Sequence, residues 1–288
     1  MTISLTSAFV EIDWNGRPVH IEHRWIAPSA AGTSAAITPL IVFLHEGLGS
    51  VSMWREFPQV LCDASACRGL VYSRPGYGRS SPRPADERWD TDFLQRQALE
   101  VLPAVLAALD VDASQQPLWL LGHSDGGSIA LLHAAHHPDG VAGVMVLAPH
   151  TFVEDLSIAS IEQARRAYLN GSLRAGLARH HDDPDSAFWG WNQAWLNPAF
   201  RDWTIQEQIA AIRAPVLAVQ GLDDVYGTLA QIESIARQLP QTRLLTMADC
   251  GHSPHRDRPQ ALIAAACDFM QSPCNPLAIP STPERATP

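Results

Sequence analysis

Short runs of consecutive apolar residues recur along the chain and alternate with segments of helical periodicity. The runs are PLIVFLHE (39–46), GLVYSR (69–74), PLWLLGHS (117–124), VAGVMVLAPH (141–150), APVLAVQG (214–221) and TRLLTMADCGH (242–252). Such runs predict strands that are buried on both faces, as in a parallel sheet. Helical patterns over 94–109, 127–136, 229–239 and 259–269 supply the covering layers. We therefore expect an α/β fold with a mostly parallel central sheet and helices on both faces.

Three segments depart from this alternation. Residues 10–27 alternate in polarity around Asn15-Gly16, which predicts a hairpin. Residues 151–205 contain no strand-like run and are rich in helix formers and tryptophan, which favours a helical cap over the edge of the sheet. We expect residues 1–150 and 206–270 to form the core in two parts, and the proline-rich residues 271–288 to form a disordered tail.

The segment Gly122-His123-Ser124-Asp125-Gly126 is a G-x-S-x-G motif between a predicted strand and a predicted helix. This motif places a serine at the apex of a strained turn, where side chains at the two glycine positions would collide. The motif alone is also compatible with an ordinary glycine-rich loop. Its flanking strand and helix favour Ser124 as a nucleophile.

A serine nucleophile needs a general base and a carboxylate that orients the base. Asp223 and Asp224 follow the strand at 214–221, and His252 and His255 follow the strand at 242–252. Both loops lie at the same edge of a parallel sheet as Ser124, so the three segments converge. His252 directly follows Gly251 at the loop apex, whereas His255 is expected to be a solvated or hydrogen-bonded surface histidine.

A serine hydrolase also needs two N–H donors for the oxyanion that forms during acyl transfer. The residue after the nucleophile supplies the first, which is the N–H of Asp125. The loop LHEGLGS (44–50) leaves a predicted strand at the same edge and supplies the second, from Glu46 or Gly47.

The segments HEGLGS, YSRPGYGRS, GHSDGG, GLDD and CGHSPH fall in this order along almost the whole predicted fold. On these motifs the chain resembles the alpha/beta-hydrolase superfamily, in the branch of small bacterial serine hydrolases with a helical cap. GHSDGGSIAL is similar to the nucleophile region of valacyclovirase-like (biphenyl-hydrolase-like) members. The resemblance implies Ser124, Asp224 and His252 as the catalytic triad, with Gly47 and Asp125 as oxyanion donors.

Two positions depart from the pattern of the family. His45-Glu46 stands where His-Gly is usual, and Ser73 replaces the aspartate that opens the D-x-x-G-x-G-x-S segment. Glu46 therefore becomes a candidate substrate contact. Asp125 adds a second carboxylate beside the nucleophile, where an ionised acid would oppose the oxyanion. Its side chain is expected to be turned aside, paired with Arg55 or Arg74, or used to select a cationic substrate.

The aromatic run FWGWNQAW (188–195) predicts helix packing, with Trp189 as a candidate that faces the cleft. His180-His181-Asp182-Asp183 is expected to be a solvated helix end rather than a metal site, because adjacent helical residues point to different sides. We expect neither a metal nor another cofactor.

The formal net charge of -10 argues against nucleic acid and anionic membranes as partners. The five cysteines form no metal-binding pair, the N-terminal segment resembles no signal peptide, and no apolar run is long enough to span a membrane. These features favour a cytoplasmic protein with a small-molecule substrate. No feature of the sequence specifies an oligomeric state.

Together, these features predict a serine hydrolase that cleaves a small or medium carboxylic ester or lactone through an acyl-enzyme. The first alternative is a carbon–carbon bond hydrolase of the aromatic ring-cleavage type, which resembling proteins include. The second is a ligand-binding protein that keeps the fold without catalysis.

Overall fold

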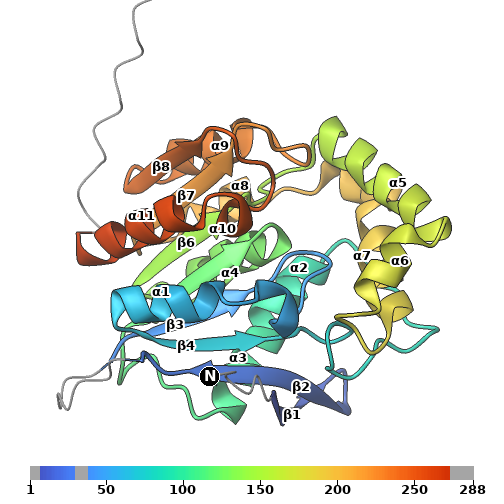
Figure 1. The fold of residues 1–288 in the computed structure, drawn as a ribbon, viewed down its shortest axis with the longest axis horizontal. Coiled ribbons are helices and arrows are strands. Elements are labelled where there is room, and N and C mark those ends of the chain that lie inside the picture. Colours follow the sequence, from blue (N-terminus) through green and yellow to red (C-terminus); the bar gives the residue numbers. More distant parts are fainter. Residues whose placement is uncertain (1–6, 30–37, 273–288) are drawn as a thin grey trace, which may run out of the picture.

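An eight-stranded sheet forms the centre of the computed structural model, which describes residues 7–29 and 38–272 (Figure 1). Its strands are β1 (Ala8–Trp14), β2 (Arg17–Ile26), β3 (Leu40–Leu44), β4 (Arg68–Tyr72), β5 (Leu118–His123), β6 (Gly143–Leu147), β7 (Val216–Gly221) and β8 (Thr242–Met247). They lie in the order β1-β2-β4-β3-β5-β6-β7-β8. The strands from β4 to β8 in that order are parallel, which confirms the predicted α/β architecture.

The first two strands form the predicted hairpin. Strand β1 pairs antiparallel with β2, and β2 continues the sheet antiparallel to β4. Asn15 and Gly16 join β1 to β2 with φ angles of 58° and 69°. Both residues therefore occupy the left-handed region that a tight hairpin turn requires, which Asn and Gly tolerate better than other residues do.

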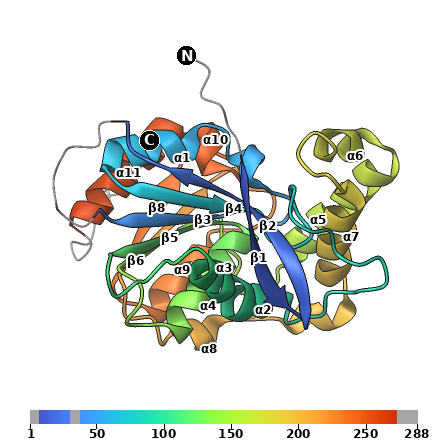
Figure 2. The ribbon, with the colours of Figure 1, turned by 90° about the horizontal axis from the view of Figure 1, so that it is seen from below.

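Helices cover both faces of the sheet (Figure 2). The core helices are α1 (Phe57–Ser65), α2 (Phe93–Arg96), the π-helical turn η2 (Gln97–Val101), α3 (Leu102–Ala108), α4 (Asp125–His136), α8 (Gln206–Ile209), α9 (Ala230–Gln238), α10 (Pro254–Asp257) and α11 (Pro259–Gln271); a 3₁₀ turn, η1, spans Val51–Trp54. On β3, Ile41 and Phe43 belong to the same hydrophobic cluster as residues of α1 and α11, whereas Val42 and Leu44 belong to the same cluster as residues of α4 and α9. The unbroken apolar run of β3 thus fills two separate cores.

Three further helices lie beyond the carboxyl ends of the parallel strands, to one side of the sheet in both views (Figures 1 and 2). They are α5 (Asp155–Leu169), α6 (Ser172–Leu177) and α7 (Pro184–Trp195), followed by the 3₁₀ turn η3 (Pro198–Asp202). Helix α7 begins where the Asp183 carboxylate accepts a hydrogen bond from the backbone N–H of Ser186 at 2.9 Å, with Pro184 at its first position. We call α5, α6 and α7 the cap helices.

The C-terminal end of the described chain is helix α11. Gln271 is its last residue, so the predicted tail lies outside the described residues except for its first two positions. None of the helices in residues 7–29 and 38–272 has the length and apolarity needed to cross a membrane.

Candidate active site

Ser124 lies at the sharp turn between β5 and α4, with φ 53° and ψ -119°. This left-handed conformation is strained for a residue with a side chain. A Cβ at Gly122 would collide with the backbone of Gly126, and one at Gly126 would collide with the carbonyl of Leu44. The two glycines of the motif therefore allow the strand, the turn and the helix to approach closely.

The structure brings Ser124, His252 and Asp224 together. The Ser124 Oγ lies 2.9 Å from His252 Nε2, and His252 Nδ1 lies 2.9 and 2.8 Å from the two carboxylate oxygens of Asp224. Asp224 also accepts hydrogen bonds from the Gln220 amide at 2.6 Å and from the N–H of Tyr226 at 2.8 Å. Asp223 is exposed, so Asp224 is the acid that faces the imidazole.

The surroundings of this triad lower the pKa values of both His252 and Asp224. Burial is the largest influence on His252 and lowers its pKa, although the hydrogen bond and charge of Asp224 act in the opposite direction. Burial would raise the pKa of Asp224, but its hydrogen bond to His252, the charge of His252 and the Tyr226 N–H keep it below its usual value. The resting site thus holds a neutral imidazole beside an ionised carboxylate, as a general base requires.

His255 is not the surface histidine that the sequence predicts. Its ring is 5% exposed and packs against Trp54 at a centroid distance of 4.9 Å and against Phe57 at 5.6 Å. Burial lowers its pKa to about 3. The helical turn of α10 directs this side chain under η1, and the structure records no hydrogen bond from its ring to Ser124.

Both predicted sources of oxyanion donors lie beside Ser124. Asp125 is the first residue of α4, where a backbone N–H has no acceptor within the helix. Glu46 and Gly47 line the same cavity as Ser124, and the N–H groups of both have no recorded partner in the described part of the chain. A Cβ at Gly47 would collide with the Trp191 indole, so the loop needs glycine for this close approach.

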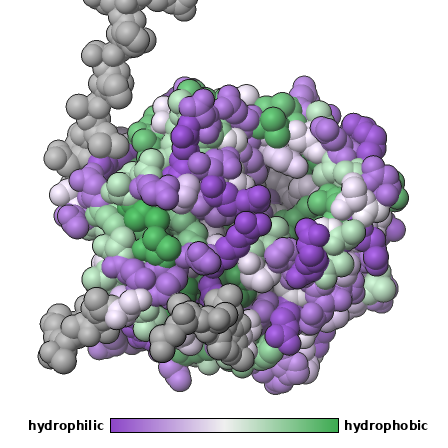
Figure 3. Space-filling model, viewed as in Figure 1, coloured by the Kyte–Doolittle hydropathy of each residue, from purple (hydrophilic) through white to green (hydrophobic). Residues whose placement is uncertain are grey.

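The triad opens into a cavity of about 120 Å³ between the core and the cap helices, where the surface is hollowed in Figure 3. Its walls are partly acidic, partly aromatic and partly aliphatic. The lining residues are Glu46, Gly47, Leu48, His123, Ser124, Asp125, His150, Ile161, Trp191, Trp195, Tyr226, His252 and Ser253. None of these described residues is an arginine.

The Asp125 side chain is buried at the wall of the cavity, with Trp195 and Arg74 beside its two oxygens. Its Oδ1 accepts a hydrogen bond from the Trp195 indole N–H at 3.1 Å, and its Oδ2 lies 4.0 Å from the Arg74 guanidinium. Burial raises the pKa of Asp125 to about 6, against the opposing influences of Arg74 and Trp195. Of the two arginines that the sequence offers, Arg74 is the ion-pair partner of Asp125.

Glu46 faces a histidine. Its carboxylate lies 3.4 Å from Nδ1 of His123, the residue directly before the nucleophile. Burial would raise the pKa of Glu46, but the hydrogen bond and charge of His123 hold it well below its usual value. Each acid near the nucleophile therefore has its own basic partner.

The structure places Trp189 outside this cavity. Trp189 packs edge-on against Tyr168 and Phe188, whereas Trp191 and Trp195 line the cavity. Positions 191 and 195 are four residues apart on α7 and share a face of the helix, which Trp189 does not occupy. Trp191 and Trp195 therefore line the cavity from this helix, and Trp189 does not.

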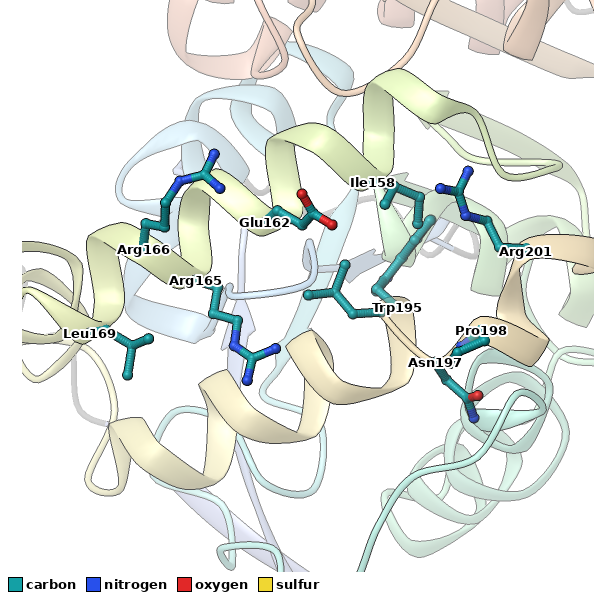
Figure 4. Close-up of a pocket in the computed structure, with 10 residues that line it drawn as sticks. Ile158, Glu162, Arg165, Arg166, Leu169, Trp195, Asn197, Pro198 and Arg201 are labelled. Carbon is teal, nitrogen blue, oxygen red and sulfur yellow. The ribbon is translucent and has the colours of Figure 1, made fainter.

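A second, outer cavity of about 510 Å³ lies between α5 and α7 and the start of η3. Figure 4 shows Trp195 in its centre, with Arg165 and Arg201 on either side. Trp195 also lines the inner cavity, so its indole forms a wall that both cavities share. Arg201 pairs with Asp155 at the outer surface.

Within the segment 180–183, His181 and Asp183 form hydrogen bonds to neighbouring backbone groups. His181 is buried, its Nδ1 accepts from the N–H of Gly78 at 2.8 Å, and its Nε2 donates to the carbonyl of Leu48 at 3.0 Å. Asp183 caps α7. In residues 7–29 and 38–272 the structure contains no group of three potential metal ligands.

Several residues at the site were not identified from the sequence. His123 occupies the variable position before the serine, and His150 follows β6 at the same edge as the other loops. The position of His150 directly after a parallel strand indicates that it lies at the edge of the sheet where the site forms. No comparable signal marked Trp195, because its contact with Asp125 joins residues 70 positions apart.

Comparisons with known proteins agree with this fold. A model of the alpha/beta hydrolase family matches residues 41–266. A 2-succinyl-6-hydroxy-2,4-cyclohexadiene-1-carboxylate synthase of Salmonella typhimurium is 24% identical over 261 residues, which cover 81% of this chain and 94% of that protein. The protein of the same name from Escherichia fergusonii is 26% identical over 267 residues, with the same coverage of 81% and 94%.

Solved structures share the fold at low sequence identity. A hydrolase from Pseudomonas aeruginosa has a TM-score of 0.70 and 20% identity, covering 93% of this chain and 99% of its own. An enol-lactonase from Burkholderia xenovorans has a TM-score of 0.68 and 19% identity, covering 92% and 100%.

Proposed function

The chain belongs to the alpha/beta hydrolase family, and from that premise we propose that it is a serine hydrolase of small or medium carboxylic esters or lactones. The observation that carries the proposal is the continuous hydrogen-bonded path from Ser124 through His252 to Asp224. Nucleophile, base and orienting acid come from three separate loops. Their arrangement is the one that acyl transfer to serine requires.

In the first half of the reaction, the Ser124 hydroxyl attacks the carbonyl carbon of the substrate and transfers its proton to His252 Nε2. Asp224 accepts the Nδ1–H of the same ring, which fixes the tautomer with a free Nε2 lone pair and stabilises the imidazolium. The N–H of Asp125 and that of Gly47 or Glu46 donate to the oxyanion.

The tetrahedral intermediate then collapses and the bond to the leaving oxygen breaks. His252 returns its proton to that oxygen, so an alcohol leaves and Ser124 remains acylated. A water molecule, deprotonated by the same imidazole, attacks the acyl carbon and releases the acid. Asp224 stays ionised throughout, consistent with its lowered pKa.

The cavity favours a compact, uncharged acyl group. Its volume of about 120 Å³ is close to the ~150 Å³ of apolar cavities that hold one benzene-sized molecule. Trp191, Trp195 and Ile161 supply apolar walls around Ser124. We therefore expect short-chain esters and small lactones to be turned over faster than long-chain esters.

The test is labelling with a fluorophosphonate, followed by a panel of p-nitrophenyl esters, lactones and amino-acid esters. The wild-type chain should be labelled and active, whereas Ser124→Ala should lose both properties. Ser172→Ala, which changes an exposed serine of α6, serves as the matched control. A wild-type chain that resists labelling would refute the proposal and favour the ligand-binding alternative, whereas a Ser124→Ala variant labelled as fully as wild type would refute Ser124 as the nucleophile.

Carbon–carbon bond hydrolysis is the second candidate. The curated relatives are named as synthases of a cyclohexadiene carboxylate, a name that indicates a carboxylate-bearing ring compound and does not itself indicate hydrolysis. A carboxylate-bearing substrate would require a cation, but the lining of the inner cavity offers Glu46 and Asp125 and no arginine. Turnover of a keto-dienoate, with simple esters inert under the same conditions, would reverse the order of the two candidates.

A further inference from the structure

His123 contacts the backbone of the catalytic base. Its Nε2 lies 2.6 Å from the backbone carbonyl oxygen of His252, and its ring is 1% exposed. A carbonyl oxygen can only accept, so the Nε2 of His123 carries a proton and donates it. This hydrogen bond joins the loop after β8 to the turn that holds the nucleophile.

The second ring nitrogen of His123 faces another acceptor. Nδ1 lies 3.4 Å from the Glu46 carboxylate, and two acceptors attract each other only with a proton between them. Because Nε2 already donates to His252, this contact requires one further proton on the pair. His123 and Glu46 together then carry no net charge.

The other titratable groups near His123 and Glu46 do not orient the His123 ring. The titratable and charged side chains around the pair and around His252 include His45, Arg74, Asp125, His150, His180, His181, Asp224, Tyr226, His255 and Arg256. His150 and His255 are buried, and burial lowers the pKa of each to about 3, so both are neutral. Asp224 is bound to Nδ1 of His252, and Asp125 is bound to Trp195. Glu46 is thus the carboxylate that orients His123.

We propose that Glu46 and His123 form a second carboxylate–imidazole pair that positions the backbone of His252, whose ring the Asp224 carboxylate orients. The inference deepens the serine hydrolase proposed above and depends on it. His123 and Glu46 are positioning residues here: they act on the reaction through His252. The pair also explains how a glutamate can stand beside the oxyanion site, because its charge is balanced within 3.4 Å.

The role of His123 as a donor is tested by a pair of substitutions. His123→Phe keeps a buried ring but removes the donor, and we expect kcat for a short-chain ester to fall about three- to tenfold with little change in KM. His123→Gln restores a donor at the position of Nε2 and should recover most of that loss. His20→Gln, at an exposed position of β2, is the control. Equal activity of His123→Phe and wild type, or equal loss in both His123 variants, would overturn the proposal.

The charge balance of the pair is tested by the acid limb of kcat/KM. In His123→Gln the Glu46 charge is no longer balanced, so the imidazolium of His252 is stabilised and the limb should move to higher pH. Adding Glu46→Gln to the same chain removes that charge and should return the limb to its wild-type position. A merely structural role predicts no such reversal, and a limb that stays displaced in the double variant would contradict the proposal.

Labelling of Ser124 separates this proposal from the one on which it depends. If wild type is labelled by the fluorophosphonate and Ser124→Ala is not, the hydrolase proposal stands whatever the His123 variants do. If wild type is not labelled, the hydrolase proposal itself fails.

Discussion

The core edge and the cap helices contribute different chemistry to the same cavity. Loops of the core supply Ser124, Asp224 and His252, whose polar atoms are joined by hydrogen bonds of 2.8 to 2.9 Å. The cap helices supply mainly apolar surface, and their polar contacts near the site include the hydrogen bond of Trp195 to Asp125 and those of Ser157 and Ser160 to the carbonyls of Tyr226 and Val225. Under the proposed function, we expect the core to carry out the reaction and the cap to determine which substrates bind.

The largest expected effect comes from removing the catalytic base in the core. His252→Ala removes the base, and kcat for a p-nitrophenyl ester should fall by about 10⁴-fold or more. His255→Ala, a neighbouring buried histidine outside the triad, should keep most of the activity but lower the melting temperature because it leaves a cavity against Trp54. Steady-state kinetics and thermal denaturation measure both. An inactive His255→Ala that remains folded would show that the base is assigned to the wrong histidine.

A smaller effect is expected at the acid. Asp224→Asn keeps the shape of the side chain but cannot stabilise the imidazolium, and it favours the wrong tautomer of His252. We expect kcat to fall by about 10²- to 10⁴-fold. Asp223→Asn, at the adjacent exposed position, should retain wild-type kinetics and is the matched control. The reverse pattern would assign the acid to Asp223.

The pH dependence should also follow from the core. His252 acts as a base only when neutral, so activity falls as the pH decreases through its pKa. Because burial lowers that pKa, the acid limb of kcat/KM should have its midpoint below pH 6.5, the usual value for histidine. A profile of kcat/KM from pH 4 to 9 tests this. A midpoint above 6.5 would mean that the charge of Asp224 outweighs burial.

The smallest effect should come from the cap. Trp195→Phe removes the indole N–H that Asp125 accepts and part of the cavity wall, but leaves the triad intact. We expect KM to change about three- to tenfold, with kcat within threefold of wild type and an altered preference for acyl length. Trp189→Phe, on the same helix but outside the cavity, should change neither. A large loss of kcat in Trp195→Phe would assign the cap a part in the reaction itself.

The sequence predicts the core better than the cap because local patterns determine more of it. Strands such as β3 and β5 are readable as apolar runs, since both of their faces are buried. Their common direction then brings the loops that bear Ser124, Asp224 and His252 to one edge. Chain order and strand ends selected Ser124 and the loops that bear the acid and the base, whereas the choice of Asp224 over Asp223 came from the resemblance to the family.

The sequence does not predict in the same way which side chains of the cap helices face the cavity. The choice between Trp189 and Trp195 depends on how α7 is rotated against the core, and an aromatic-rich helix shows no clear polar face. The pairing of Asp125 with Arg74 likewise depends on the path of the loop after β4. His255 was misplaced because its burial under Trp54 comes from packing between distant segments.

The backbone at Ser124 has a consequence for how this chain tolerates change. A residue with φ 53° and ψ -119° reduces the free energy of unfolding by about 1–3 kcal/mol relative to an unstrained turn. Glycine at this position would relieve the strain, so the substitution that abolishes catalysis could also yield a more stable protein. Selection for thermal stability alone would therefore act against the nucleophile, and a screen for robust variants needs an activity assay beside it.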